Sequence, residues 1–481
     1  MNKRKQKLLL NTTIFAISNF ASKVLVFLML PIYTSILTTA EYGTADLIIS
    51  VTTLSLPFLT MCIGDAGLRF ALKNEYDNKK VFTQGLIIVF WGTVVLCAVY
   101  PLLACIGFIG KNIIYVYIIS IPCYFSDYLL KYSRGVGKIR EVGISGVLST
   151  FIMIMTNIVC LIVLKLGIHG YLLSYFATYT ANVLYMLFGA KLYKLFSFDA
   201  IKNFDTRLMK KMLKYSLPLI PNQACWWIND TANKYIINSY LGTESVGLYS
   251  AAYKIPAIFT TIQSFFSEAW LLSAIEEEKS KDKIEFYVNY YDYYCSAIVV
   301  ICSFLMLFSK PLASILYSNS FIKAGIYVPG LLLSSMFGGL VGFIGAFFNA
   351  YNETKYLFTS TIIGAGCSIG LNLILTSVIG ISGAVFANVL SYVVIWMIRF
   401  FEARHVLKIR LHCSRLLISL MFLAGQITSS YLLYNRLICW LVSNLILLVA
   451  CIFIWRKEIL VLLNGTLKSV IVKYKHNGKE Y

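Results

Sequence analysis

The residues with the clearest chemical potential are the few charged side chains that lie inside long apolar runs of the sequence. A charge at the centre of a bilayer costs about 2.5–3.5 kcal/mol on insertion scales, so such residues face protein, water or ligand. Lys23 lies near the middle of its run, roughly 20 Å from either end of a helix and too far for its side chain to reach a headgroup. It is predicted to bind an anionic ligand in a cavity, or else to form a buried ion pair.

Lys254 is the second candidate for anion binding. It lies about eight residues into its apolar run and is followed by Pro256, whose missing N–H permits a bend in the helix. At that depth the side chain either reaches a cavity or extends along the apolar surface to the membrane boundary. Lys23 and Lys254 are therefore the predicted substrate-binding residues.

Asp230 and Lys234 are predicted to form a gate or an ion-coupling site. They are four residues apart, so they share one face of a helix, and an intrahelical ion pair is the alternative. A carboxylate inside a membrane can also bind a proton or Na⁺. Glu268 is a further coupling candidate of the same kind.

Three other acidic residues lie close to the ends of apolar runs. Asp46 is expected to be solvated, Asp65 to pair with Arg69 four residues later, and Asp127 to pair with Lys131. Interfacial ion pairs at a spacing of four are typical of helix ends.

The sequence contains no catalytic or metal-binding pattern. Most of the 12 cysteines lie inside apolar runs, without CxxC or His-Cys spacing. The sequence contains no nucleophile–base constellation and no glycine-rich phosphate loop. We therefore expect neither an enzyme nor a bound metal or cofactor.

The composition requires that these residues be positioned by membrane helices. Of the 481 residues, 58% are apolar and only 13% are charged, whereas soluble domains carry about 25% charged residues. The apolar residues form runs long enough to cross about 30 Å of hydrocarbon as helices. Fourteen spans are predicted, at about residues 10–36, 44–68, 81–108, 112–130, 143–164, 168–190, 214–239, 246–272, 287–308, 324–348, 356–378, 381–400, 416–434 and 437–455.

The distribution of basic residues predicts the orientation of these spans. With the N-terminus in the cytoplasm, the inside segments hold 34 of the 42 Lys and Arg residues, counting Arg399 at the edge of one segment. The outside loops hold five. This bias follows the positive-inside rule, so both termini are predicted to be cytoplasmic. It also accounts for most of the net charge of +20 without a nucleic-acid partner.

Two pairs of short segments indicate a parallel internal repeat. The segment Leu37-Thr38-Thr39-Ala40-Glu41-Tyr42-Gly43 resembles Leu241-Gly242-Thr243-Glu244-Ser245-Val246-Gly247, and Gly167-Ile168-His169-Gly170 resembles Gly380-Ile381-Ser382-Gly383. Transport pathways often lie between such repeats. The predicted organisation is an N-lobe at 1–195, a cytoplasmic linker at 196–213, a C-lobe at 214–405, two extra helices in 406–455 and a basic tail at 456–481.

The first repeated segment, from Leu30-Pro31-Ile32-Tyr33 to Gly43, and its echo from Leu241 to Ala251 resemble the opening of bacterial polysaccharide biosynthesis transporters. These are the O-antigen and capsule repeat-unit flippases, which share a superfamily with lipid II flippases and multidrug (MATE) exporters. The resemblance covers about residues 8 to 455. It implies an all-α fold of two pseudo-symmetric six-helix lobes in the inner membrane. It also implies flipping of undecaprenyl-diphosphate-linked oligosaccharides, together with polymerase and chain-length proteins of the same pathway.

Three other functions compete with the flippase. An H⁺- or Na⁺-coupled exporter of small molecules would share the fold, although cationic drugs favour an acidic cavity and the deepest charge here is a lysine. A polymerase or ligase would need a larger outside loop than the longest one here, at about residues 309–323. A purely structural subunit would leave the deep charges unexplained.

Overall fold

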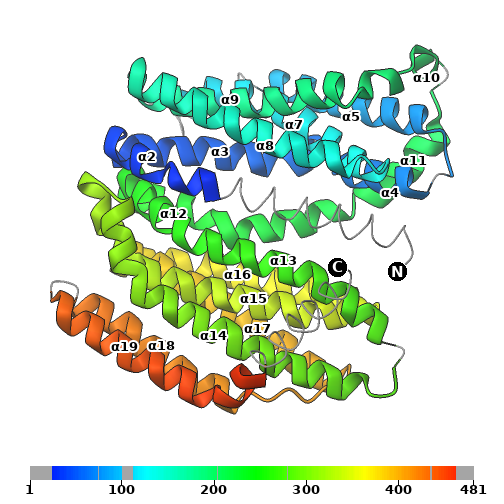
Figure 1. The fold of residues 1–481 in the computed structure, drawn as a ribbon. Helices are drawn as coiled ribbons and strands as arrows, with labels where there is room; N and C mark the ends of the chain where they lie inside the picture. The colour runs from blue at the N-terminus through cyan, green and yellow to red at the C-terminus, as the bar shows by residue number, and fades with distance from the viewer. Residues whose placement is uncertain are drawn as a thin grey trace, which may run out of the picture. The chain divides into compact units, whose positions relative to one another are not determined.

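The computed structural model describes residues 24–73, 75–99, 112–202, 204–278, 280–433 and 436–461. Within these residues the chain is helical, and ten of the helices are long and apolar enough to cross a membrane. A shorter apolar helix spans Val24–Ile36, the described end of the first predicted span. Each of the other predicted spans coincides with at least one helix, so the chain is a multi-pass helical membrane protein (Figure 1).

The helices gather into two compact units. The first consists of Met1–Ser250 with Leu316–Phe321, and the second of Ala251–Ile315 with Ile322–Tyr481. These units follow spatial contact, whereas the predicted lobes follow the repeat, and the division at residues 196–213 stays a prediction.

The first unit is built from α2 to α12. Its helices are α2 (Leu30–Ile36), α3 (Thr39–Leu59), α4 (Ile63–Lys73), α5 (Asn78–Ala98), α7 (Ile113–Gly135), α8 (Ile139–Asn157, continued by a π-helix to Val163), α9 (Ile168–Leu184), α10 (Phe198–Lys202), α11 (Thr206–Ser216) and α12 (Leu219–Ala252).

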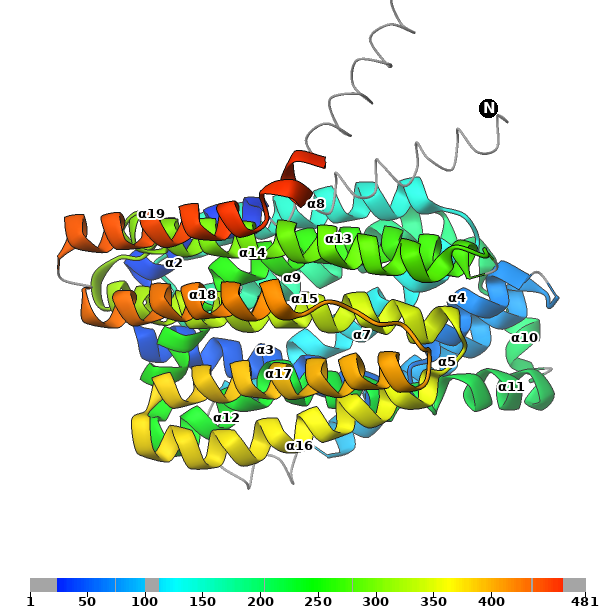
Figure 2. The same cartoon turned by 90° about the horizontal axis from the view of Figure 1, so that it is seen from below.

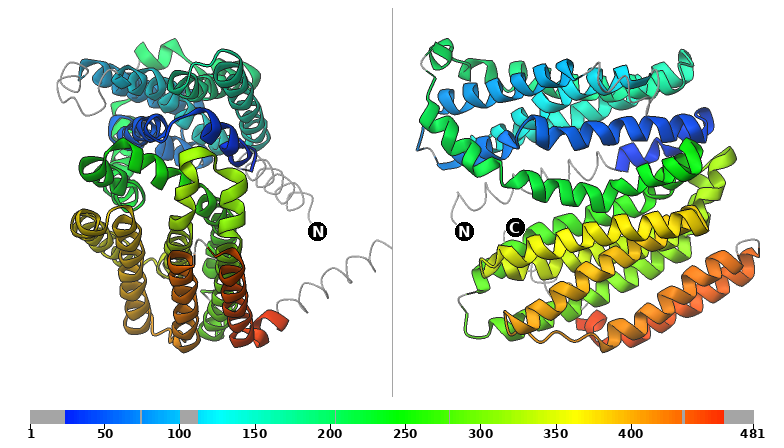
Figure 3. Two further views of the ribbon diagram at one scale, coloured as in Figure 1. Left: turned by 90° about the vertical axis from the view of Figure 1, so that its left-hand side faces the viewer. Right: turned by 180° about the vertical axis from the view of Figure 1, so that it is seen from behind.

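The second unit is built from α13 to α19. Its helices are α13 (Lys254–Glu277), α14 (Lys283–Leu316), α15 (Val328–Ala350), α16 (Thr354–Ile379), α17 (Ile381–His405), α18 (Ser414–Leu432) and α19 (Leu437–Ile454). The orange and red helices α18 and α19 pack side by side (Figure 3).

Two short connections between predicted spans, from 164 to 168 and from 378 to 381, form helical hairpins. Gly167 joins α8 to α9 with φ 55° and ψ −133°, and Gly380 joins α16 to α17 with φ 64° and ψ −142°. This backbone region favours glycine because a Cβ would clash there. The two repeated segments therefore share one unusual conformation, and the α16–α17 hairpin is visible in Figure 2.

The predicted second span, residues 44–68, is not one continuous helix. Helix α3 ends at Leu59 and α4 begins at Ile63, while Met61 and Cys62 adopt φ values of 52° and 51°. Pro57 lies one turn before the break, and its missing N–H weakens the helix there. A broken span of this kind leaves backbone groups available to line a cavity.

The seventh and eighth predicted spans are separated at Gly242, which lies between the predicted bounds of 239 and 246. Helix α12 continues to Ala252 across a kink at Gly242, where φ is 76° and ψ is 174°. Helix α13 begins only at Lys254. Because the dihedral angles of Gly242 are non-helical, the helical path ends there and a second helical segment begins after it, so the predicted separation of the two spans is confirmed. Tyr253, with φ −71° and ψ −14°, is the single residue between this segment and α13.

Candidate functional site

The first repeated segment packs against its echo inside the first unit. A Cβ added at Gly43 would lie 2.0 Å from the Thr243 carbonyl oxygen, and one added at Gly247 would lie 1.9 Å from the Thr39 carbonyl oxygen. The two contacts are reciprocal, with the sequence offset of 204 relating Thr39 to Thr243 and Gly43 to Gly247. Small residues at a spacing of four allow helix backbones to approach closely. The start of α3 and the end of α12 are therefore joined by a pseudo-symmetric crossing.

A partly buried ion pair lies beside this crossing. The Lys234 ammonium is 2.6 Å from Asp46, and their side chains are 16% and 14% exposed. The Ser250 hydroxyl donates a 2.8 Å hydrogen bond to the same carboxylate. Our expectation that Asp46 is solvated is wrong, because α12 brings a cation and a hydroxyl to it from far along the chain.

The same pair of helices is joined by an aromatic contact. The Trp227 indole N–H donates to the Ser50 carbonyl oxygen at 3.2 Å, and the Tyr235 hydroxyl lies 2.7 Å from the Ser50 hydroxyl. The Trp227 and Tyr235 rings are 5.4 Å apart. Trp227 therefore packs between α12 and α3, which positions the turn of α12 that carries Lys234.

A second charged cluster lies after the break in α3–α4. The Lys131 ammonium on α7 is 3.0 Å from Asp65 on α4 and 3.2 Å from Asp127, four residues earlier on its own helix. The predicted Asp127–Lys131 pair is confirmed. A Cβ at Gly64 would lie 2.8 Å from the Lys131 side chain, so the absence of a side chain there lets the cluster close against α4.

The predicted Asp65–Arg69 pair is wrong. Asp65 binds Lys131 instead, and the Gln223 amide of α12 donates to it at 3.4 Å. The Arg69 guanidinium lies 4.2 Å from the centre of the Tyr215 ring, a cation–π distance. Sequence spacing placed Asp65 and Arg69 on one helix face but could not supply partners from α7, α11 and α12.

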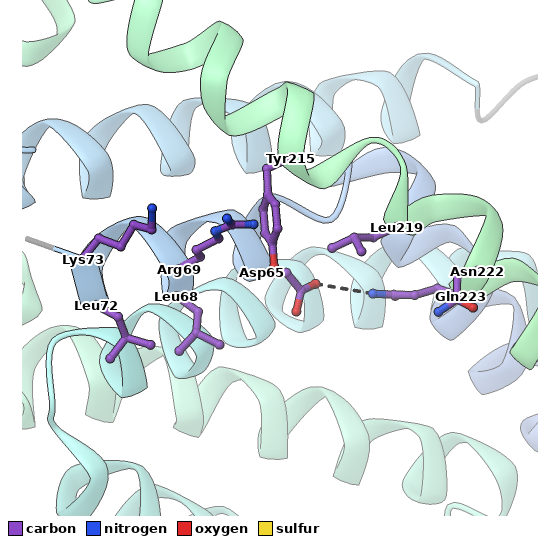
Figure 4. Close-up of a pocket in the computed structure, with 9 residues that line it drawn as sticks. All are labelled: Asp65, Leu68, Arg69, Leu72, Lys73, Tyr215, Leu219, Asn222 and Gln223. Carbon is purple, nitrogen blue, oxygen red and sulfur yellow. Dashed lines mark hydrogen bonds between the residues drawn. The ribbon is translucent and has the colours of Figure 1, made fainter. Parts of the chain in front are cut away.

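Helices α4 and α12 line a pocket with a volume of about 600 Å³. Figure 4 shows Arg69 and Lys73 of α4 extending to the same side as Tyr215, with Leu68 and Leu72 pointing away from them. The wall opposite α4 comes from the end of α11 and the start of α12. The complete lining is Asp65, Leu68, Arg69, Leu72, Lys73, Tyr215, Leu219, Asn222 and Gln223.

The pocket wall is cationic. Its carboxylate, Asp65, already binds Lys131, whereas Lys73 makes only a 3.6 Å contact to Glu75 with both side chains about half exposed. Exposed pairs of this kind contribute little binding energy. Sequence reasoning missed this site, although Asp65, Arg69 and Lys73 lie four residues apart and thus on one helix face. The sequence signal for this site was that spacing, together with the two consecutive amide residues Asn222 and Gln223 that directly follow Pro221.

The predicted site residues are not all brought together. Lys23 lies outside the described residues. Lys254 is the first residue of α13, in the second unit, and it follows the helical segment that begins after Gly242. Asp230 and Glu268 are exposed on α12 and α13, and Lys234 forms the ion pair with Asp46 described above.

Arg399 is a buried cation that the sequence interpretation placed at the edge of a cytoplasmic segment. It is 3% exposed and donates to the Val341 carbonyl at 2.8 Å and to the hydroxyls of Ser360 and Thr361 at 3.0 Å each. The charge is thus met by neutral acceptors on α15 and α16. Its geometry stabilises the three-helix packing of α15, α16 and α17 and leaves few donors for a ligand.

The chain is similar to a known protein family in sequence and to solved structures in fold. A family model described as polysaccharide biosynthesis protein matches residues 8–271. No curated protein sequence matches the chain. The fold is similar to an inward-facing multidrug resistance MATE family transporter of the MOP superfamily, with a TM-score of 0.68 and 15% identity over 82% of this chain and 99% of that one.

Two further solved structures have the same architecture. Lipid II flippase MurJ in an inward closed conformation gives a TM-score of 0.64 with 13% identity, covering 93% of this chain and 100% of that one. An outward-facing MATE family transporter gives 0.60 with 15% identity, covering 83% and 95%. The all-α fold predicted from the sequence is confirmed.

Proposed function

The chain belongs to the polysaccharide biosynthesis protein family, as its resemblance predicted, and we propose that it flips lipid-linked oligosaccharides across the membrane. The family match carries this proposal, because residues 8–271 contain the broken α3–α4 span, both charged clusters and the cationic pocket. The multi-pass helical fold supports movement through the protein by alternating access.

The proposed substrate is an undecaprenyl-diphosphate-linked repeat unit, moved from the cytoplasmic to the periplasmic leaflet of the inner membrane. A diphosphate needs cations when it leaves water for a medium of low dielectric constant. Lys23 and Lys254 are the proposed substrate-binding residues within the spans. Asp230, Lys234 and Glu268 are the proposed gating or ion-coupling residues, with Lys234 acting through its ion pair to Asp46.

The same proposal includes the protein's setting. Both termini face the cytoplasm, as the basic loops predict, and the two repeats form six-helix lobes. The protein acts as a transporter without enzymatic activity, beside the polymerase and chain-length proteins that consume its product.

A cation-coupled exporter of small molecules is the second candidate function. One observation favours it: two carboxylates, Asp65 and Asp127, share the single ammonium group of Lys131. The formal charge of that trio is negative, which would suit the uptake of a proton or Na⁺. The fold likeness to a multidrug resistance transporter points the same way.

A deletion experiment separates the two functions. The gene is deleted in a polysaccharide-producing host, and surface glycan and intracellular lipid-linked repeat units are both measured. The flippase predicts loss of surface glycan, inward accumulation of the lipid intermediate and rescue by the wild-type gene. Unchanged surface glycan with increased drug sensitivity would reject the flippase and support the exporter. Lys23→Ala and Lys23→Arg then test whether the cation is needed.

A further inference from the structure

We propose that the pocket between α4 and α12 is a docking site for the diphosphate headgroup of the lipid substrate before it enters the transport path. This inference rests on the proposed function for the identity of the lipid. The position of the pocket supports it, because α4 ends at Lys73 and α11 belongs to the basic stretch 191–214. Both segments are predicted to lie at the cytoplasmic boundary, where the substrate is made.

The charges in the pocket suit a diphosphate. Arg69 and Lys73 lie one helical turn apart on α4 and extend to the same side in Figure 4. Guanidinium groups bind phosphate oxygens through two parallel hydrogen bonds, and lysine adds a mobile point charge. Asp65, the acidic member of the lining, is held by Lys131 at 3.0 Å, which it shares with Asp127, so its repulsion of an anion is partly offset.

Arg69 is already held in a defined position. Its guanidinium lies 4.2 Å from the centre of the Tyr215 ring. Stacking on an aromatic face leaves the edge of the guanidinium plane free for hydrogen bonds to a second group. Less side-chain entropy is then lost when a phosphate binds, and preorganisation of this kind raises affinity.

The remaining lining suits the groups attached to a diphosphate. Asn222 and Gln223 supply amide donors and acceptors for phosphate or sugar oxygens, whereas Leu68, Leu72 and Leu219 provide an apolar wall. A lipid headgroup joins a polar end to a hydrocarbon chain, and the pocket offers both surfaces. Its volume of about 600 Å³ lies within the usual range for small-molecule sites.

The test measures binding to the full-length protein in detergent. The probes are undecaprenyl diphosphate, inorganic pyrophosphate and uncharged undecaprenol. The variant Arg69→Gln with Lys73→Gln removes both charges from the pocket. The matched control is Lys79→Gln with Lys80→Gln, which removes two exposed charges at the nearby start of α5. Melting temperatures of all variants verify folding, and Arg69→Lys keeps the charge while losing the planar fork.

We expect the pocket variant to bind undecaprenyl diphosphate at least about ten-fold more weakly, because charge-assisted hydrogen bonds are lost. The control should bind like wild type, and undecaprenol should bind all variants equally. Equal affinity of the pocket variant and the wild type for undecaprenyl diphosphate would overturn the inference. Tighter binding of pyrophosphate than of the lipid would also overturn it, by assigning the pocket to a soluble anion.

Failure of this inference is distinguishable from failure of the proposed function. The same variants are tested for rescue of surface glycan in the deletion strain. A pocket variant that binds normally, while the wild-type gene still restores glycan, rejects the docking site and leaves the flippase intact. A wild-type gene that restores no glycan rejects the flippase itself.

Discussion

The crossing of α3 and α12 makes a quantitative prediction about two equivalent glycines. In Gly43→Ala the new Cβ would lie 2.0 Å from the Thr243 carbonyl oxygen, whereas ordinary contact begins near 3.4 Å. The helices would have to separate by about 1.4 Å to accommodate it. Overpacking of this kind costs about 3 kcal/mol at its upper range, and alanine returns about 1 kcal/mol through its better helix propensity. We expect a net loss of about 2 kcal/mol.

The assay is thermal unfolding of the purified protein in one detergent. Gly43→Ala and Gly247→Ala should each lower the apparent melting temperature by a few degrees. The matched control is Gly146→Ala in α8, where a Cβ would meet nothing within 4 Å. That variant should match or slightly exceed the stability of the wild type.

The reciprocal geometry adds a stricter requirement. Once Gly43→Ala has separated the helices, the second substitution at Gly247 should cost less than it does alone, because both side chains enter the same contact. The double variant should therefore lose less than the sum of the single losses, by about 1 kcal/mol. Additive losses would place the two glycines in independent contacts. A Gly43→Ala variant as stable as Gly146→Ala would refute the crossing itself.

Three other features give shorter predictions. Asp46→Asn and Lys234→Met should each destabilise the protein by about 3 kcal/mol in thermal unfolding, and the double variant should recover part of that loss; a double variant as unstable as the sum would exclude the pair. Arg399→Met should cost about 3 kcal/mol because buried acceptors lose their donor, whereas Arg404→Met, at an exposed position, should be nearly neutral. Backbone N–H groups at the start of α11 lower the pKa of Asp205. Its stabilisation of that helix end should persist above the ordinary Asp pKa and be lost as the pH falls through the lowered value. Because intrinsic amide exchange also slows as the pH falls, the measurement is the protection factor of the α11 amides, which should decrease; protection factors that change equally in Asp205→Ala would contradict this role.

The positions of the helices could be predicted because the bilayer imposes their length and polarity. Apolar runs located the membrane helices, and Gly167 and Gly380 located two hairpins because their backbone conformation excludes other residues. Interruptions were harder to predict. The chain breaks at Met61 and Cys62, which adopt positive φ values, although neither residue type favours that conformation.

The charged site could be predicted only where both partners lie on one helix. The spacing of Asp127 and Lys131 was sufficient for their pair. The partners of Asp46 and Asp65 come from other helices, and no local pattern distinguishes a solvated carboxylate from one that another helix covers. The repeat did contain a relevant signal, because Asp46 and Ser250 are related by the same offset of 204 as the two glycines.

Helix α12 is held to the α3–α4 segment at two separated points, and this arrangement predicts coupling between them. Lys234 and Ser250 bind Asp46 near one end of the segment, and Gln223 binds Asp65 beyond the break. An anion in the pocket would lie beside Gln223, so its binding energy depends on where α12 sits. Suppose that transport moves α12 relative to α3, and that the Asp46 contact and the pocket each favour one position of α12. Loosening the Asp46 contact must then change the affinity of the pocket for a diphosphate, because two sites that bias the same conformational equilibrium are linked reciprocally. We expect Asp46→Asn to change the affinity for undecaprenyl diphosphate about five-fold or more, although Asp46 does not line the pocket. An unchanged affinity in a folded Asp46→Asn protein would show that α12 is a fixed wall of the pocket, and that the moving element must be sought elsewhere.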